Sequence, residues 1–264
     1  MTMYRRIAVK VGSNVLTRQD GTLNVTRLSA LVDQIAEIRH AGIEVILISS
    51  GAMASGRGEL HLDKERIALL DEVAQRQLFS AVGQAKLINR YYDFLREHHI
   101  PCGQVLCQKE NFTSGEEQKN MSSCMEVMLQ HGVLPVVNEN DVVSITELMF
   151  TDNDELSGEI AKMTHADALF ILSNIDGLYD GDPEDSCSTV IPEVAYGHSV
   201  EEYIQAKKSS AGRGGMQSKC STALKVAEAG IDVYLARGTR KNVLTDLVFK
   251  RGDVPHTHFV PKAK

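Results

Sequence analysis

No stretch of the sequence approaches the roughly 20 consecutive apolar residues that a membrane-spanning helix needs. The N-terminus runs into an apolar segment ending at Lys10, which is too short for the core of a signal peptide and has no small-residue cleavage site after it. The five cysteines include no CxxC pair, and their odd number does not suit a disulfide framework. We therefore expect a cytoplasmic protein with reduced thiols, no zinc or other protein-held metal site and no membrane contact.

The sequence also lacks an excess of positive charge. Its 28 lysines and arginines face 35 acidic residues, which gives a formal net charge of −7. Such a chain has no general attraction to nucleic acid, so an anionic substrate must be held by a local cluster of donors. The 264 residues would suit one large α/β domain or two small ones, and we expect one domain over 1–264.

Short β-branched runs alternate with longer helical patterns, and continuous apolar runs suit a sheet covered on both faces. The expected strands are 7–11, 45–48, 104–106, 133–137, 169–172 and 233–235. The apolar faces of the expected helices include Leu28, Leu31, Ile35 and Ile38, and later Leu156, Ile160 and Met163. The order βαβα predicts an open αβα sandwich with a mainly parallel central sheet.

Glycine and proline mark where this rhythm stops. Gly42 and Gly132 lie where two helices should end before the next strand. The segment 177–199 reads as irregular structure or a small hairpin, and 252–264 as a finishing strand or a tail. Ligands of open parallel sheets bind beyond the carboxyl ends of the strands, so the loops there are the candidate site.

Two of these loops are candidate phosphate sites, although no GxxxxGK[ST] motif of a P-loop occurs. Lys10 closes the first strand before Gly12, which would place a cation beside free backbone N–H groups; the alternative is a lysine that reaches solvent. Segment 212–219 places glycines and Lys219 at the start of a helix expected over 220–229, which suits an anion. The helix dipole disfavours a lysine in the first turn, so Lys219 indicates a role in holding negative charge.

The other polar loops each have a structural alternative. Segment 49–56 contains serines and glycines that suit either a binding loop or a tight turn with a serine N-cap. The run 138–141 could hold an amino group or form an Asx turn. The run 151–154 opens a helix, and an N-cap at Asp152 would explain only part of its polarity. In 173–179, Leu178 and Tyr179 could form an adenine pocket or anchor a loop.

These segments, in this order and with Val82-Gly83-Gln84 between them, resemble the amino acid kinase family, and most closely its members that act on free glutamate. The resemblance implies transfer of the γ-phosphoryl group of ATP to the side-chain carboxylate of L-glutamate. The product would be the acyl phosphate that begins proline synthesis. Mg²⁺ would be bound mainly through the nucleotide phosphates.

The resemblance also implies the site residues. Glutamate binding falls to Ser50, Gly51, Asp141 and Asn153, and catalysis to Lys10, Lys219 and Asp154, with Asp154 holding the two lysines. Nucleotide binding falls to Lys10, Gly12, Ser173, Asn174, Arg213, Gly214, Gly215, Met216 and Lys219. The chain departs from the family at Asn174, where an aspartate is frequent, and at Met149, where a lysine is common.

Further expectations concern partners and regulation. We expect a homo-oligomer, a glutamyl phosphate reductase as downstream partner, and no C-terminal PUA domain. Proline should inhibit by binding at or over the glutamate site, beneath a mobile flap formed by 57–76. The alternatives are a sister kinase acting on N-acetylglutamate, aspartate, carbamate or UMP, and a nucleotide-binding regulatory protein without catalysis.

Overall fold

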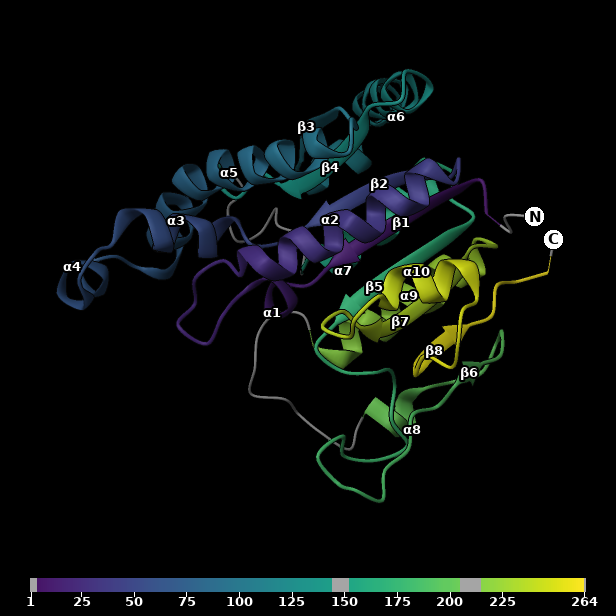
Figure 1. Ribbon diagram of the computed structural model, residues 1–264. Helices are drawn as coiled ribbons and strands as arrows, with labels where there is room; N and C mark the ends of the chain where they lie inside the picture. Colours follow the sequence, from purple (N-terminus) through teal and green to yellow (C-terminus); the bar gives the residue numbers. More distant parts are fainter. Residues whose placement is uncertain (1–3, 144–151, 205–214, 264) are drawn as a thin grey trace.

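The core of the molecule is one eight-stranded sheet in a computed structural model that describes residues 4–143, 152–204 and 215–263 (Figure 1). The strands are β1 (Arg6–Val11), β2 (Glu44–Ser49), β3 (Cys102–Cys107), β4 (Leu134–Glu139), β5 (Ala168–Ser173), β6 (Glu193–Val194), β7 (Asp232–Arg237) and β8 (His256–Phe259). They lie in the order β3-β4-β2-β1-β5-β7-β8-β6. Neighbours are parallel except for β7 and β8, which confirms the predicted mainly parallel sheet.

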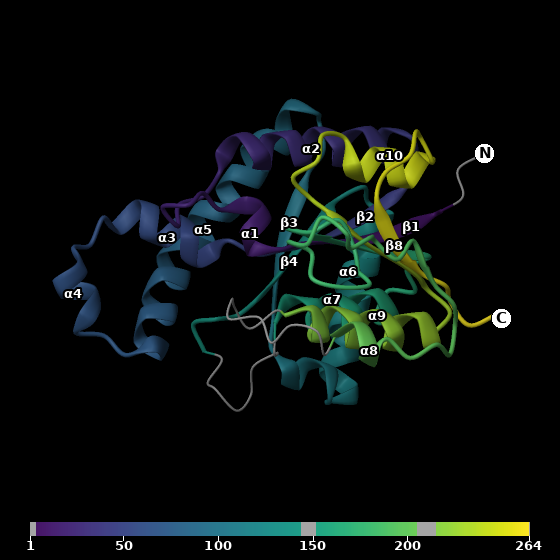
Figure 2. The same cartoon turned by 90° about the horizontal axis from the view of Figure 1, so that it is seen from below.

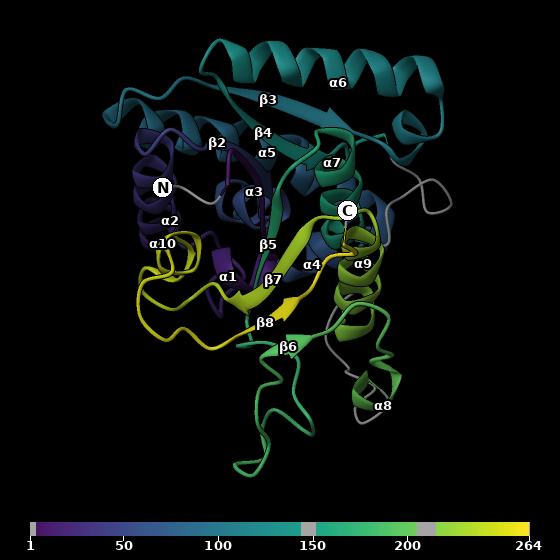
Figure 3. The ribbon, with the colours of Figure 1, turned by 90° about the vertical axis from the view of Figure 1, so that its right-hand side faces the viewer.

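Helices cover both faces of this sheet (Figures 2 and 3). They are α1 (Ser13–Leu16), α2 (Val25–His40), α3 (Ala52–Leu60), α4 (Lys64–Ala68), α5 (Glu72–Glu97), the 3-10 helix η1 (Lys109–Phe112), α6 (Gly115–Gln130), α7 (Asn153–Met163), α8 (Glu201–Ile204), α9 (Met216–Glu228) and α10 (Val243–Phe249). Residues of α2, α5 and α10 form one apolar core, and residues of α6, α7 and α9 form the other. The αβα layering is therefore as predicted.

The strand and helix patterns explain the layers. Alternate residues of β1 enter opposite cores, with Val9 on the α2 side and Ala8 on the α7 side, and every residue of the strand is buried. The predicted face of α2 is also buried, whereas Met163 of α7 is only partly buried against its core. Burial on both faces is the reason that these strands read as continuous apolar runs.

The structure also shows what forms at the predicted helix ends and in the two segments predicted to be irregular. Gly42 and Gly132 follow helices with φ of +86° and +74°, values that favour glycine, which confirms the predicted stops. Segment 177–199 forms no hairpin of strands; it holds one antiparallel bridge and then β6, which pairs parallel with β8. The finishing strand is β8. All strands of the described residues share one sheet, and the single domain over 1–264 stays a prediction.

One expectation on local structure is wrong, and another stays a prediction. The helix expected over 220–229 begins four residues earlier, at Met216, with Gly215 as its N-cap. The segment 57–76, predicted as a flap, is largely helical and comprises the end of α3, all of α4 and the start of α5. These helices form an arm that projects from the body at the left of Figure 1. The mobility of this arm stays a prediction.

The carboxyl ends of the parallel strands meet at the same edge as this arm. At that edge β1 lies between β2 and β5, so successive strands are added on opposite sides of it. A reversal of strand order of this kind leaves a crevice at the sheet edge, which is where ligands of open α/β folds bind.

Candidate active site

Three charged side chains meet in the crevice beyond β1. The carboxylate of Asp154, in the first turn of α7, lies 2.5 Å from the Lys10 ammonium and 3.0 Å from the Lys219 ammonium. Asp154 is fully buried, and the side chains of Lys10 and Lys219 are 6% and 10% exposed. The elements β1, α7 and α9 thus bring together the residues predicted to be catalytic, in the contact that the family resemblance implied; their catalytic role stays a prediction.

The electrostatics of this cluster follow from its burial and its charges. Burial alone would raise the pKa of Asp154, but the charges of Lys10 and Lys219 outweigh it and hold that pKa below its ordinary value. Ionised Asp154 and two ammonium groups together carry one positive charge in a site from which water is largely excluded. Such a charge is suited to the oxygens of a phosphoryl group.

Asp152 organises the start of α7. Its carboxylate accepts hydrogen bonds from the backbone N–H groups of Asp154 (2.8 Å) and Glu155 (3.1 Å), so the predicted N-cap is confirmed. Burial, and then the charge of Asp154, raises the pKa of this carboxyl group. The cap holds the first turn of the helix in place, and with it the Asp154 side chain between the lysines.

Asn153 connects the cluster to the neighbouring loops. Its amide nitrogen lies 3.0 Å from the Ser50 hydroxyl, 3.1 Å from the Asn138 side-chain oxygen and 3.3 Å from the Ser49 carbonyl. The loops after β2 and β4 are therefore joined at the start of α7. Ser50 and Asn153, both predicted to bind glutamate, are direct neighbours, and Gly51 beside them has φ +108°, which only glycine adopts readily.

Asp141, the remaining residue predicted to bind glutamate, is held by α5. Its carboxylate forms an ion pair with Arg76 and accepts a hydrogen bond from the Ser80 hydroxyl at 3.2 Å. Arg76 also pairs with Glu139 at 2.8 Å. Arg76 was expected only as the last residue of the flap over 57–76, and its contact with Asp141 was not predicted. A signal was present, because Arg76, Ser80 and Gln84 recur every four residues and so share one face of a helix.

Gly12 differs from its expected setting. Its backbone N–H donates to the Leu172 carbonyl at 3.0 Å, so the prediction of a free N–H beside Lys10 is wrong at this residue. A Cβ atom here would lie 3.2 Å from the Leu172 oxygen and 3.7 Å from the Lys10 ammonium. The missing side chain of Gly12 therefore leaves space beside the Lys10 ammonium, whereas its N–H group is not available to a phosphate.

The predicted nucleotide residues lie partly at the ends of β5 and α9. Ser173 is buried, and its hydroxyl lies 3.3 Å from the Asn174 side-chain oxygen. Leu178 is part of the core on the α7 side and its N–H donates to Thr257, so it anchors the loop as the alternative interpretation expected. Gly215 and Met216 begin α9. Arg213, Gly214 and Met149 lie outside the described residues.

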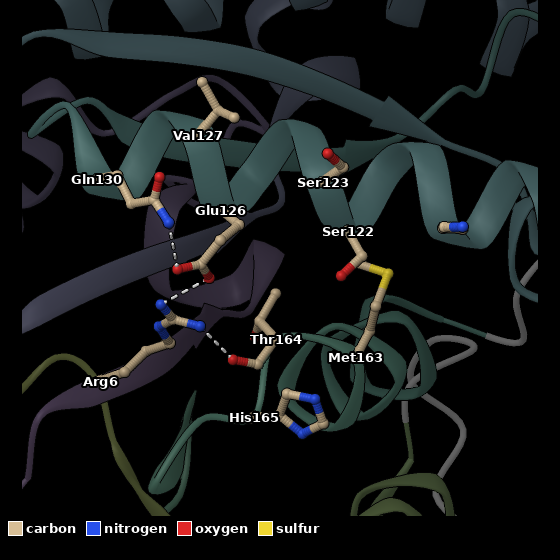
Figure 4. Close-up of a pocket in the computed structure, with 10 residues that line it drawn as sticks. Arg6, Ser122, Ser123, Glu126, Val127, Gln130, Met163, Thr164 and His165 are labelled. Atoms are coloured by element: carbon tan, nitrogen blue, oxygen red, sulfur yellow. Dashed lines mark hydrogen bonds and ion pairs between the residues drawn. The ribbon is translucent and has the colours of Figure 1, made fainter.

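A cavity of about 500 Å³ lies at the opposite edge of the sheet, between α6 and the end of α7 (Figure 4). The Arg6 guanidinium at its wall is bonded to Glu44 (2.7 Å), Glu126 (2.8 Å) and the Thr164 carbonyl (2.5 Å). Its main cation is thus already paired, and it lies at the amino end of β1. This cavity is a structural junction and does not compete with the crevice as the candidate site.

The described residues contain neither a cluster suited to a metal ion nor a helix suited to a membrane. Within 4–143, 152–204 and 215–263, no group of three or more His, Cys, Asp and Glu side chains is placed to hold a metal ion. In the same part of the chain, no helix has the length and apolar character required to cross a membrane.

Solved structures of other kinases share this fold. A carbamate kinase from Giardia lamblia bound to AMP-PNP matches with a TM-score of 0.70 and 14% identity, over 99% of this chain and 100% of that one. An isopentenyl phosphate kinase matches with a TM-score of 0.67, over 97% and 100%. Residues 5–237 match the amino acid kinase family, and the chain belongs to that family.

The curated relatives are glutamate 5-kinases. The protein of Bacteroides thetaiotaomicron is 60% identical over 261 residues, which are 99% of this chain and 71% of that protein. The Chlorobaculum tepidum protein is 46% identical over 92% of this chain, which spans 66% of that protein. The Clostridium acetobutylicum protein is 36% identical over 100% of this chain and 97% of its own length.

Proposed function

We propose that this protein transfers the γ-phosphoryl group of ATP to the side-chain carboxylate of L-glutamate. The product is L-glutamyl 5-phosphate, formed in the first step of proline biosynthesis. The observation that carries the proposal is the buried Lys10–Asp154–Lys219 cluster beside the network of Ser50 and Asn153. The 60% identity to a glutamate 5-kinase supports glutamate over the substrates of sister kinases.

The reaction requires no proton transfer by the protein. The attacking carboxylate is already ionised near neutral pH, so no general base is needed. The protein must align the carboxylate with the γ-phosphorus and stabilise charge on the transferred group. Lys10 and Lys219 are placed to contact its oxygens from β1 and α9, and Asp154 fixes the direction of both ammonium groups.

The nucleotide lies, in this proposal, across the ends of β5 and α9. The N-terminal turn of α9 begins at Met216 after Gly215, and the unbonded N–H groups of a helix start suit a phosphate. Mg²⁺, bound mainly through the phosphates, would supply further neutralisation of their charge.

Hydroxylamine trapping tests the function directly. With L-glutamate, ATP and Mg²⁺, the protein should form glutamyl hydroxamate, because hydroxylamine captures the acyl phosphate. A coupled assay with N-acetylglutamate, aspartate, carbamate and UMP should show lower activity on each. Preference for one of these would identify a sister kinase, and ATP binding without hydroxamate would indicate a regulatory protein.

Replacing Asp141 with alanine should separate the two substrates. If Asp141 holds the α-ammonium group, Asp141→Ala should raise the KM for glutamate about tenfold or more, the scale for losing a charged hydrogen bond. The KM for ATP should change little. Steady-state kinetics with Asp33→Ala, a surface aspartate, as control would show this. An equal rise in both KM values would contradict the assignment.

Proline should inhibit in competition with glutamate. Both ligands carry an α-ammonium and an α-carboxylate group, so Ser50, Asp141 and Asn153 could hold either one. Inhibition should weaken as glutamate rises, and substitutions in 57–76 should alter proline sensitivity more than kcat. Kinetics at several glutamate concentrations measure this, and inhibition that glutamate cannot relieve would exclude an overlapping site.

The wider setting follows from the same proposal. An acyl phosphate is reactive toward water, which favours rapid delivery to a glutamyl phosphate reductase. A homo-oligomer in the cytoplasm, with this reductase as partner, remains our prediction for the working form of the protein.

A further inference from the structure

Helix α5 presents a row of polar side chains to the end of β4 and to the loop that follows it. The Arg76 Nε lies 2.7 Å from Asp141 Oδ1, and one of its terminal nitrogens lies 2.8 Å from Glu139 Oε2. One turn later, the Ser80 hydroxyl donates to the other Asp141 oxygen. A further turn along, Gln84 accepts a hydrogen bond from Asn138 at 2.8 Å. The helix therefore supports the loop along its length.

Burial makes the position of Arg76 important. The side chains of Glu139 and Asp141 are 5% and 14% exposed, and that of Arg76 is 18% exposed. Two carboxylates this close and this sheltered from water would repel each other without a cation between them. The planar guanidinium meets both carboxylates at once, a geometry that the single ammonium group of a lysine does not reproduce.

The charges of this trio also indicate what kind of ligand it accepts. Two carboxylates and one guanidinium together carry one negative charge. A carboxylate oxygen accepts more than one hydrogen bond, so Asp141 retains capacity for another donor beside Arg76 and Ser80. A primary ammonium group can donate to Asp141 as a cation, whereas an acylated amine carries no positive charge. This matches free glutamate rather than an N-acyl derivative.

We propose that Arg76 is a positioning residue for the amino-acid substrate. Arg76 holds Asp141 in the orientation in which that carboxylate receives the α-ammonium group of glutamate. By pairing with Glu139 as well, Arg76 keeps the Glu139 carboxylate from pushing Asp141 out of that orientation. The inference rests on the proposed function for the identity of the amino acid. It assigns the arm at the start of α5 a part in selecting the substrate.

The test compares Arg76→Gln with Arg76→Lys and with Lys86→Gln. Lys86 lies on the same helix and pairs with Glu59 at the surface, so it is a matched control. Arg76→Gln should weaken glutamate binding, measured by calorimetry, about tenfold or more, the scale for a charge-assisted contact. The affinity for ATP should stay within about twofold, because only the amino-acid site changes. The glutamate affinity of Arg76→Lys should lie between those of Arg76→Gln and the unmodified protein, and that of Lys86→Gln should match the unmodified protein.

A double-mutant cycle shows whether Arg76 acts through Asp141. In an Asp141→Asn background, Arg76→Gln should have little further effect on glutamate affinity, because its target is already altered. If Arg76→Gln does not fold, as judged by circular dichroism, the same cycle is run with Arg76→Lys. Equal losses of affinity in both backgrounds, or unchanged affinity in a folded Arg76→Gln protein, would overturn the inference.

The same measurements separate this inference from the proposed function. If the unmodified protein binds glutamate but forms no hydroxamate, the kinase function fails while the affinity comparison still tests Arg76. If the unmodified protein does not bind glutamate at all, both the function and the inference are wrong.

Discussion

Replacing Lys219 with alanine is expected to lower kcat by about 100-fold or more, the scale for removing one preorganised donor to a transition state. The Lys219 side chain is only 10% exposed and its ammonium group is aligned by Asp154, so water cannot readily take its place. Its contact with the transferring group strengthens as charge moves between oxygens. The KM values should therefore change less than kcat. Single-turnover and steady-state rates of hydroxamate formation measure the effect.

Two further variants make this result specific. Lys225→Ala removes an exposed lysine from the same helix and should leave kcat unchanged. Lys219→Arg keeps the charge in a larger group and should recover only part of the rate. A kcat for Lys219→Ala within a few-fold of the unmodified protein would show that Lys219 does not contact the reacting phosphoryl group.

Replacing Asp154 with asparagine should damage both stability and rate. It leaves two buried ammonium groups without their shared carboxylate, and breaking a buried ion pair in this way costs about 3 kcal/mol or more of unfolding free energy. ATP with Mg²⁺ should stabilise the variant more than the unmodified protein, because the phosphates replace the missing negative charge. Thermal and urea unfolding, with and without nucleotide, measure this, and Asp253→Asn at the surface is the control.

The same comparison has a defined pH dependence. The folded-state pKa of Asp154 is depressed, so its contribution to stability is complete above the ordinary value of 3.8 and is lost as pH falls through the lower folded-state value. The difference in unfolding free energy between the unmodified protein and Asp154→Asn should therefore persist at neutral pH. It should narrow as the pH falls below 3.8 toward the folded-state pKa of Asp154. A difference that is absent at neutral pH would contradict the charge role of Asp154.

Much of the fold could be predicted because burial on two faces leaves a plain mark in a sequence. β5 is apolar at every position except its last, β1 is apolar between and after its two charged residues, and α2 buries the residues spaced along one face. The meeting of Lys10 with Asp154 was predicted from the family resemblance, and the geometry of the sheet explains it. Lys10 ends a parallel strand and Asp154 opens a helix at the same edge.

Other features depend on contacts that no local pattern specifies. Arg76 meets Asp141 across 65 residues of sequence, and the pairing exists only because α5 docks against the loop after β4. The amide of Gly12 is taken by Leu172 because the pairing of β1 with β5 continues past the strand end. The early start of α9 follows from Gly215, which serves as cap where the sequence analysis expected an extended glycine loop.

The central place of β1 has a consequence for how the protein is made. β1 is the first strand to be synthesised, yet one of its two edges remains open until Ala168–Ser173 of β5 has emerged. Synthesis proceeds from the N-terminus at several residues per second, and an unpaired strand edge is a template for association with other chains. From the emergence of β2 until that of β5, the central strand is thus paired on one side only, and its open edge can associate with other chains during that interval.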